Sequence, residues 1–191
     1  MRVDIRTETD ETGKKFEIPW QDPATGTGFL DLRAQASAVE LIGAAREHRS
    51  LAGFLAAVNS SDSLFLTARA KVWLEDRPAS DEPYLFTGRI VLAFAEMAAN
   101  LERSGFTHVL ERLQELLAGT EASEALRACL TLHLCRYAEV AQWGFCVSLL
   151  VQASGSTEEQ AGLRWALGLA HVQQALLFSS RVLRQERARR S

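Results

Sequence analysis

EALRACLTLHLCRYAEVAQWGFCVSLLVQASGSTEEQAGLRWALGLAHVQQALLFSSRVLRQER, residues 124–187, contains neither proline nor aspartate, and the last of each in the chain are Pro83 and Asp81. Proline removes a backbone donor and clashes with the preceding helical turn, while the short aspartate carboxylate competes for backbone hydrogen bonds. The absence of both residues from 84–191 therefore predicts long helices in that half. The first 83 residues hold all four prolines, and we expect them to be rich in turns.

Glycines that follow apolar segments indicate where the helices end, since glycine suits a left-handed C-terminal cap. These glycines are Gly105, Gly119 and Gly155. The pattern predicts one helix over 107–118 and a longer one that begins after Thr120, its N-cap, and runs to about Ala153.

A last helix is predicted from Ser156 to about Arg187, because Ser156 and Glu159 have the spacing of a capping box. Two helices of this length, joined by a Ser-Gly-Ser turn, would form an antiparallel hairpin about 45 Å long at 1.5 Å per residue.

The first part of the chain has the alternating pattern of strands. Segments 2–8 and 16–20 alternate apolar and charged residues around a turn near Gly13, which predicts a β-hairpin, and 29–33 is the candidate for a third strand. Helical spacing follows over 34–48 and 51–58.

Alternation is clearest over 64–75, where Leu64, Leu66, Ala68, Ala70, Val72 and Leu74 are predicted to face the same way. The segment 84–95 fits two readings. Its alternation favours a strand to about Ala93, whereas Ile90, Phe94 and Met97 also form a helical stripe, and the sequence leaves this choice open.

Together these patterns predict a single α+β domain over residues 1–191. Residues 1–95 are expected to form an antiparallel sheet of about five strands with one or two short helices inserted. Residues 96–191 are expected to be entirely helical, with the long antiparallel hairpin at the centre of a layer that packs on the sheet.

The composition is that of a globular protein, with 47% hydrophobic residues, 24% charged residues and a formal charge of −3. This balance does not predict nucleic-acid binding. The arginines at 181–190 complement the negative end of a helix dipole, although contact with RNA or an anionic lipid stays open as an alternative.

The three cysteines, Cys129, Cys135 and Cys146, lie within one predicted helix, and their odd number argues against a disulfide framework. No secretory signal is recognised at the start, and no apolar run reaches the roughly 18 residues of a membrane span. We therefore expect a cytoplasmic protein without a membrane partner.

Candidate chemistry is limited to Cys129, His133 and Tyr137, which would stack at successive four-residue steps of the long predicted helix. A thiol, an imidazole and a phenol in one place could bind a small molecule or activate a nucleophile. A buried structural histidine is the competing interpretation. No nucleotide-binding, metal or hydrolase motif is present, so we expect no cofactor, no metal and no catalytic residue.

The two long predicted helices carry apolar residues on more than one side, and a helix apolar all round must be covered on both sides. The cover is either the rest of the chain or a second protein, most simply another copy. The predicted dimer interface consists of Trp143, Leu150, Trp165, Leu169, Val172 and Leu176. These observations predict a non-enzymatic interaction or accessory protein that forms a homodimer or binds a protein partner. The alternative is a small-molecule module or enzyme around Cys129, His133 and Tyr137.

Overall fold

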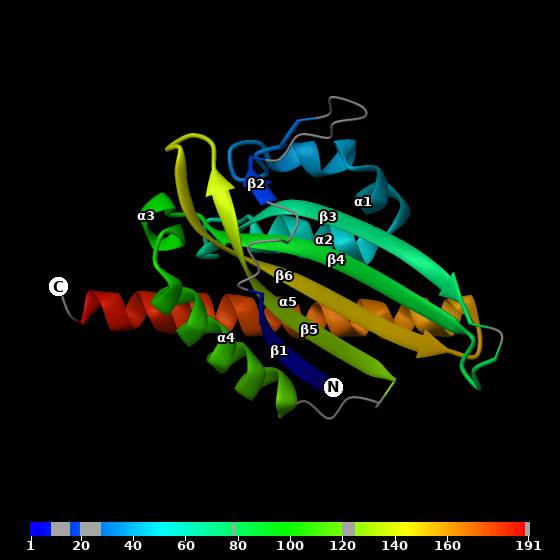
Figure 1. Cartoon of the computed structure of the whole chain (residues 1–191). Coiled ribbons are helices and arrows are strands. Elements are labelled where there is room, and N and C mark those ends of the chain that lie inside the picture. Colours follow the sequence, from blue (N-terminus) through cyan, green and yellow to red (C-terminus); the bar gives the residue numbers. More distant parts are fainter. Residues whose placement is uncertain (9–15, 20–27, 78, 120–124, 190–191) are drawn as a thin grey trace.

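The computed structural model describes residues 1–8, 16–19, 28–77, 79–119 and 125–189. It contains one mixed sheet, with the longest helices packed on one of its faces (Figure 1). The strands are β1 (Arg2–Glu8), β2 (Phe16–Ile18), β3 (Phe65–Asp76), β4 (Tyr84–Phe94), β5 (Leu126–Tyr137) and β6 (Gln142–Gly155). The helices are η1 (Ala36–Leu41), α1 (Gly43–Glu47), α2 (Arg49–Val58), α3 (Met97–Asn100), α4 (Arg103–Ala118) and α5 (Glu158–Ala188).

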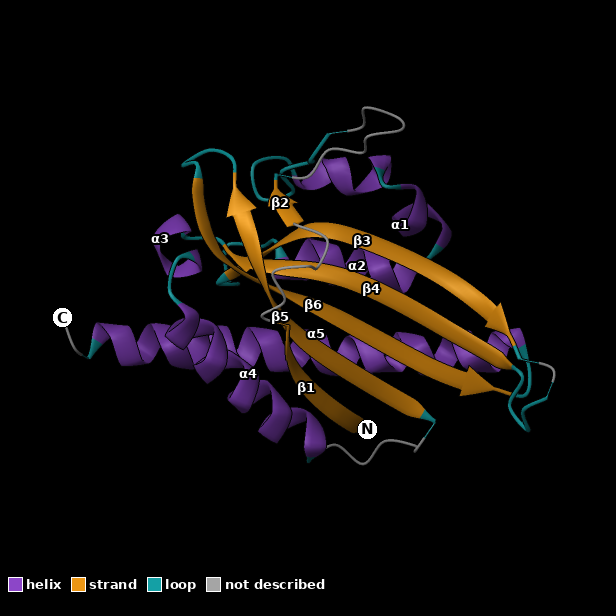
Figure 2. Cartoon of the chain, viewed as in Figure 1, coloured by secondary structure: helices purple, strands orange, loops and turns teal. Residues whose placement is uncertain are grey.

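The strand order is β1-β5-β6-β4-β3, and β2 also pairs with β5. Helices α2, α4 and α5 pack on the same face of the sheet, with α5 running under β4, β5 and β6 (Figure 2). The α+β class is therefore confirmed. The predictions of α2, β3, β4, α4 and α5 are confirmed in type, and the open choice at 84–95 resolves as a strand.

The long helix predicted after Thr120 to about Ala153 is wrong, because β5 and β6 form an antiparallel pair there. Residues 96–191 are therefore not all helical, and the chain has no antiparallel helical hairpin over 126–188. The physical reason is that proline and aspartate are as unfavourable in strands as in helices, so their absence does not distinguish the two. Thr120 itself lies outside the described residues.

The glycine caps are also corrected. Gly105 lies inside α4, and Gly155 is the last residue of β6. Gly119 does cap α4, but with a right-handed φ of −73°. The N-cap of α5 is Thr157, whose hydroxyl accepts the Gln160 amide at 3.1 Å, so the capping pattern lies one residue later than predicted.

The predicted N-terminal hairpin is wrong, because β1 and β2 do not pair with each other. Both run parallel to β5, where Glu8 pairs with His133 and Phe16 with Cys135. The sheet is consequently mixed and not antiparallel. The turn near Gly13 and the end of the second predicted strand at Trp20 lie outside the described residues.

Two shorter predictions in the first half also need correction. Residues 29–33 form no strand but irregular chain and a turn. The helix predicted over 34–48 is divided into η1 and α1 at Ile42, whose backbone is extended with ψ near 111°.

The alternation of β3 is interrupted by a β-bulge between Thr67 and Arg69. Phe65 precedes the bulge, Ala70 and Val72 follow it, and all three pack in the main core. Leu66 and Ala68 instead pack in a smaller cluster on the other face. A bulge adds one residue and shifts the phase of the strand, so the predicted set from Leu64 to Leu74 does not share one face.

The main core lies between the sheet and the helices and draws on both halves of the chain, from Leu51 and Phe54 to Val172 and Leu176. Gly88 on β4 permits the close approach of α5, since a Cβ there would lie 2.6 Å from Cζ2 of Trp165. The Trp165 ring also contacts Phe86, with centroids 4.9 Å apart. This contact fixes which side of α5 faces the sheet.

Candidate functional site

Cys129, His133 and Tyr137 all lie on β5 and face the same way, because side chains two or four residues apart in a strand share a face. We call this side, which points away from α5, the far face of the sheet. Four residues of strand span about 13 Å, roughly twice the separation in a helix. The three side chains therefore do not converge on one site.

The surroundings of the three residues differ. Cys129 is half-buried and its thiol lies 3.8 Å from the Thr131 hydroxyl. His133 is buried, opposite Cys146 on β6 in the strand register. The buried Tyr137 donates its hydroxyl to the Phe145 carbonyl at 2.7 Å, which is the contact of a structural tyrosine.

Cys135, Cys146 and Tyr137 do come together, in the small cluster on the far face with Ile18 and Val91. The hydrogen bond to Cys135 raises the pKa of Cys146, and burial raises that pKa further. Burial is also the main cause that raises the pKa of Tyr137. The same hydrogen bond lowers the pKa of Cys135, so the two thiols shift in opposite directions. All three side chains are at most 1% exposed, and buried cysteines of this kind are chemically inert.

Within the ranges that the structure describes, no three His, Cys, Asp or Glu side chains are placed to hold a metal ion. In the same ranges no helix is long and apolar enough to cross a membrane.

A groove of about 380 Å³ lies beside β3, the last strand in the order of the described sheet. Its lining includes residues Thr67 to Lys71 of β3 together with Phe29, Leu41 and Ile42. Its volume is in the range of small-molecule sites. Cys129, His133 and Tyr137 do not line it, so the groove and the predicted site are separate places.

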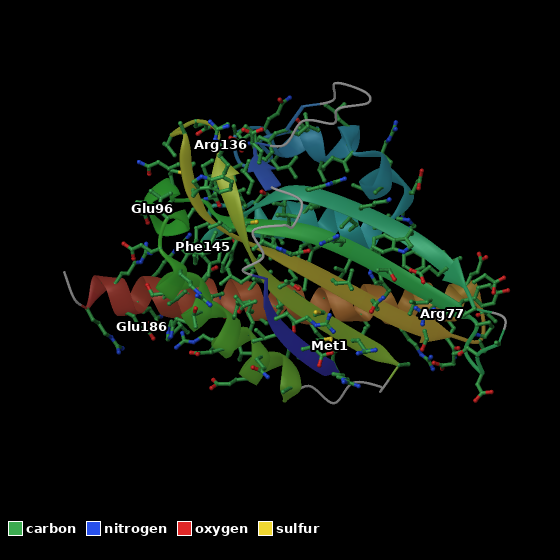
Figure 3. All side chains as sticks on the ribbon, viewed as in Figure 1. Met1, Arg77, Glu96, Arg136, Phe145 and Glu186 are labelled. Atoms are coloured by element: carbon green, nitrogen blue, oxygen red, sulfur yellow. The ribbon has the colours of Figure 1, made fainter. Side chains whose placement is uncertain are left out.

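The residues of the predicted dimer interface are divided among three places. Trp165, Leu169, Val172 and Leu176 are buried against the chain's own sheet. Trp143 is 48% exposed near the end of the β5–β6 hairpin, the end at which Arg136 is labelled in Figure 3. Leu150 is a half-buried residue of β6 on the far face of the sheet. The six residues do not form one surface.

The side of α5 that faces solvent lies opposite the side that carries Trp165, Leu169 and Val172 against the sheet. We define the outer row of α5 as the exposed residues Leu163, Leu167, Ala170, Gln174, Phe178 and Arg181. Leu163 is 66% exposed, Leu167 51% and Phe178 49%. The sequence carried this signal, because both apolar sides of the helix were visible in it. It did not show which of them the sheet covers.

Some of the C-terminal arginines bind the chain itself. Arg184 donates to the carbonyls of Ser61 and Ser63, and Arg187 pairs with Glu96 at 2.8 Å. Glu96 and Glu186, labelled in Figure 3, lie near this end of α5, where Glu186 also pairs with Arg112 at 3.2 Å. These contacts hold the end of α5 against its neighbours and account for part of the basic tail.

Comparison of the chain with protein-family models, with curated proteins and with solved structures found no match.

Proposed function

We propose that the chain is a non-enzymatic interaction or accessory protein, which binds another protein chain through the outer row of α5. The observation that carries the proposal is the exposure of Leu163, Leu167 and Phe178 along a single side of one helix. Single exposed apolar residues are ordinary, but an aligned apolar row on one helix is typical of a binding surface.

The fold does not need these three side chains. The core side of α5 is already filled by Trp165, Leu169 and Val172, which are at most 2% exposed. A solvent-facing row serving only solubility would carry charged residues. The apolar row is therefore available for contact with a partner.

The alternative of a small-molecule site or enzyme at Cys129, His133 and Tyr137 has less support. The spacing along β5 separates the three groups, and the buried Tyr137 hydroxyl is occupied by the Phe145 carbonyl. The cytoplasmic location is still a prediction from the sequence. We therefore propose to test the interaction in that compartment.

The test is site-specific photo-crosslinking in living cells that express the full chain. Benzoylphenylalanine in place of Leu167 should give a discrete protein adduct, identified by mass spectrometry, that disappears when Leu163→Gln and Phe178→Gln are added. The matched control places the same photo-crosslinker at Gln114, an exposed residue of α4. Absence of an adduct at position 167, or the same adducts from both positions, would rule the proposal out.

A further inference from the structure

We infer that the partner of the outer row is a second copy of this chain, with the two α5 helices antiparallel about a two-fold axis near Ala170. This inference rests on the proposed function, since it names the partner of that same surface. A self-complementary surface is what a two-fold dimer requires, because each residue of the patch meets another residue of the same patch.

The distribution of charge along α5 is the first argument. Glu158 and Glu159 occupy the first turn, and Arg181 lies near the other end. Glu159 and Arg181 are both exposed, and neither has an ion-pair partner among the residues that the structure describes. A parallel pair of helices would place like charges together, whereas an antiparallel pair places each acidic end beside a basic end.

The spacing along the helix is the second argument. Glu159 and Arg181 both stand 11 residues from Ala170, on opposite sides of it. At 1.5 Å per residue each is about 16 Å from the axis, so Glu159 would lie level with Arg181 of the second copy. Eleven residues also correspond to nearly three whole turns, which keeps both side chains on the same side of the helix as Ala170.

The apolar residues have a matching arrangement. Leu163 lies seven residues before Ala170, and Phe178 lies eight residues after it. In the antiparallel pair, Leu163 of each copy is therefore almost level with Phe178 of the other. Ala170 would meet its own symmetry mate, where a small side chain lets the two helix backbones approach closely.

The charges have a competing explanation, because acidic residues at the start and arginines at the end of a helix also suit its own dipole. That explanation does not account for the exposed leucines and phenylalanine between them. It also predicts that reversing the charge of Glu159 alone, or of Arg181 alone, would have no effect on association. The experiment can therefore separate the two explanations.

Sedimentation velocity of the full chain over a range of concentrations should show a monomer–dimer equilibrium. Leu163→Gln with Phe178→Gln should weaken the dimer at least tenfold. Glu159→Arg or Arg181→Glu alone should weaken it about three- to tenfold, because two symmetric pairs become repulsive. The double variant Glu159→Arg with Arg181→Glu should restore the affinity to within about twofold of the native chain. Circular dichroism of each variant checks that the fold is retained.

A cysteine scan tests the position of the axis. In a Cys129→Ser background, Ala170→Cys should form an intermolecular disulfide in mild oxidant, and Gln114→Cys on α4 should not do so at the same concentration. Cys135 and Cys146 are fully buried and can stay in place.

A native chain that stays monomeric at millimolar concentration overturns the inference, and so does a dimer unaffected by the outer-row variants. The photo-crosslinking at Leu167 separates this failure from failure of the proposed function. An adduct with a different protein, together with a monomeric native chain, leaves the proposed function standing and removes the second copy. Absence of any adduct together with a monomeric chain removes both.

Discussion

Two adjacent serines of α5, Ser179 and Ser180, are both fully buried but have different hydrogen bonding. The Ser180 hydroxyl accepts the Leu64 amide at 3.0 Å and donates to the Leu176 carbonyl at 2.9 Å. The Ser179 hydroxyl has no hydrogen-bond partner in the part of the chain that the structure describes. A buried polar group without a partner costs free energy, whereas a satisfied one contributes to stability.

We therefore expect opposite effects from one substitution at neighbouring positions. Ser180→Ala leaves the Leu64 amide without its acceptor and should lower the free energy of unfolding by about 1–3 kcal/mol. Ser179→Ala removes an unsatisfied hydroxyl and introduces a better helix former, so it should leave stability unchanged or raise it by up to about 1 kcal/mol. Urea unfolding measures both, and equal destabilisation by the two substitutions would contradict this account.

Individual residues could be placed partly correctly from the sequence even where the element was wrong. Cys129, His133 and Tyr137 do share a face, because a step of four residues is close to one helical turn and is also two strand repeats. What the pattern could not provide was the rise per residue, which is more than twice as large in a strand. The same-face prediction therefore survives, while the convergence on one site does not.

At the scale of elements, the helix predicted after Thr120 was wrong because the composition of this segment does not distinguish a helix from a strand. Leu126, Ala128, Leu130 and Leu132 alternate with Arg127, Cys129, Thr131 and His133, which is the period of a strand. The signal was present, but leucines four residues apart satisfy the helical pattern too. Only the residues between the leucines distinguish a strand from a helix here, since the apolar face of a helix would also need apolar residues at three-residue steps.

The contact between β4 and α5 leads to a prediction about glycine. Gly88→Ala places a Cβ 2.6 Å from the rigid, buried Trp165 ring, so α5 must move away from the sheet. Overpacking of this kind costs about 1–3 kcal/mol, and we expect the thermal midpoint to fall by several degrees.

Gly53 in α2 is the matched control, because a Cβ there meets nothing within 4 Å. Gly53→Ala in a helix interior should raise stability by about 0.5–1 kcal/mol. Differential scanning calorimetry of both variants checks the pair. A neutral Gly88→Ala variant would mean that α5 does not pack on β4 in this way.

At the scale of the whole molecule, the sheet depends on pairings that local patterns do not encode. Segment 2–8 pairs in parallel with 127–133, across more than a hundred residues of chain. Alternation identifies such a strand, but only tertiary packing selects its neighbour. For this reason the α+β class was predictable, whereas the mixed sheet and its strand order were not.

One polar network joins three distant parts of the molecule at the start of α5. Arg164 of α5 donates to Glu82 at 2.6 Å and to the Ser154 carbonyl at 2.7 Å, and the Ser154 hydroxyl donates to Glu82. Glu82 lies in the loop between β3 and β4, and Ser154 lies near the end of β6. The network therefore links a loop, the sheet and the helix.

The Ser154 hydroxyl and then the Arg164 guanidinium lower the pKa of Glu82 below its ordinary value of 4.5. Because the folded-state pKa is lower than the unfolded one, the ionised network stabilises the fold above about pH 4.5. That contribution is lost as the pH falls through the folded-state pKa.

Glu82→Gln should therefore lower the free energy of unfolding at pH 7, and its difference from the native chain should shrink as the pH falls below 4.5. Urea unfolding at a series of pH values measures this difference. Glu40→Gln, at an exposed glutamate of η1 without an ion pair among the described residues, should show no comparable dependence. A Glu82→Gln difference that stayed constant down to pH 3 would mean that the network does not tie α5 to the sheet in solution.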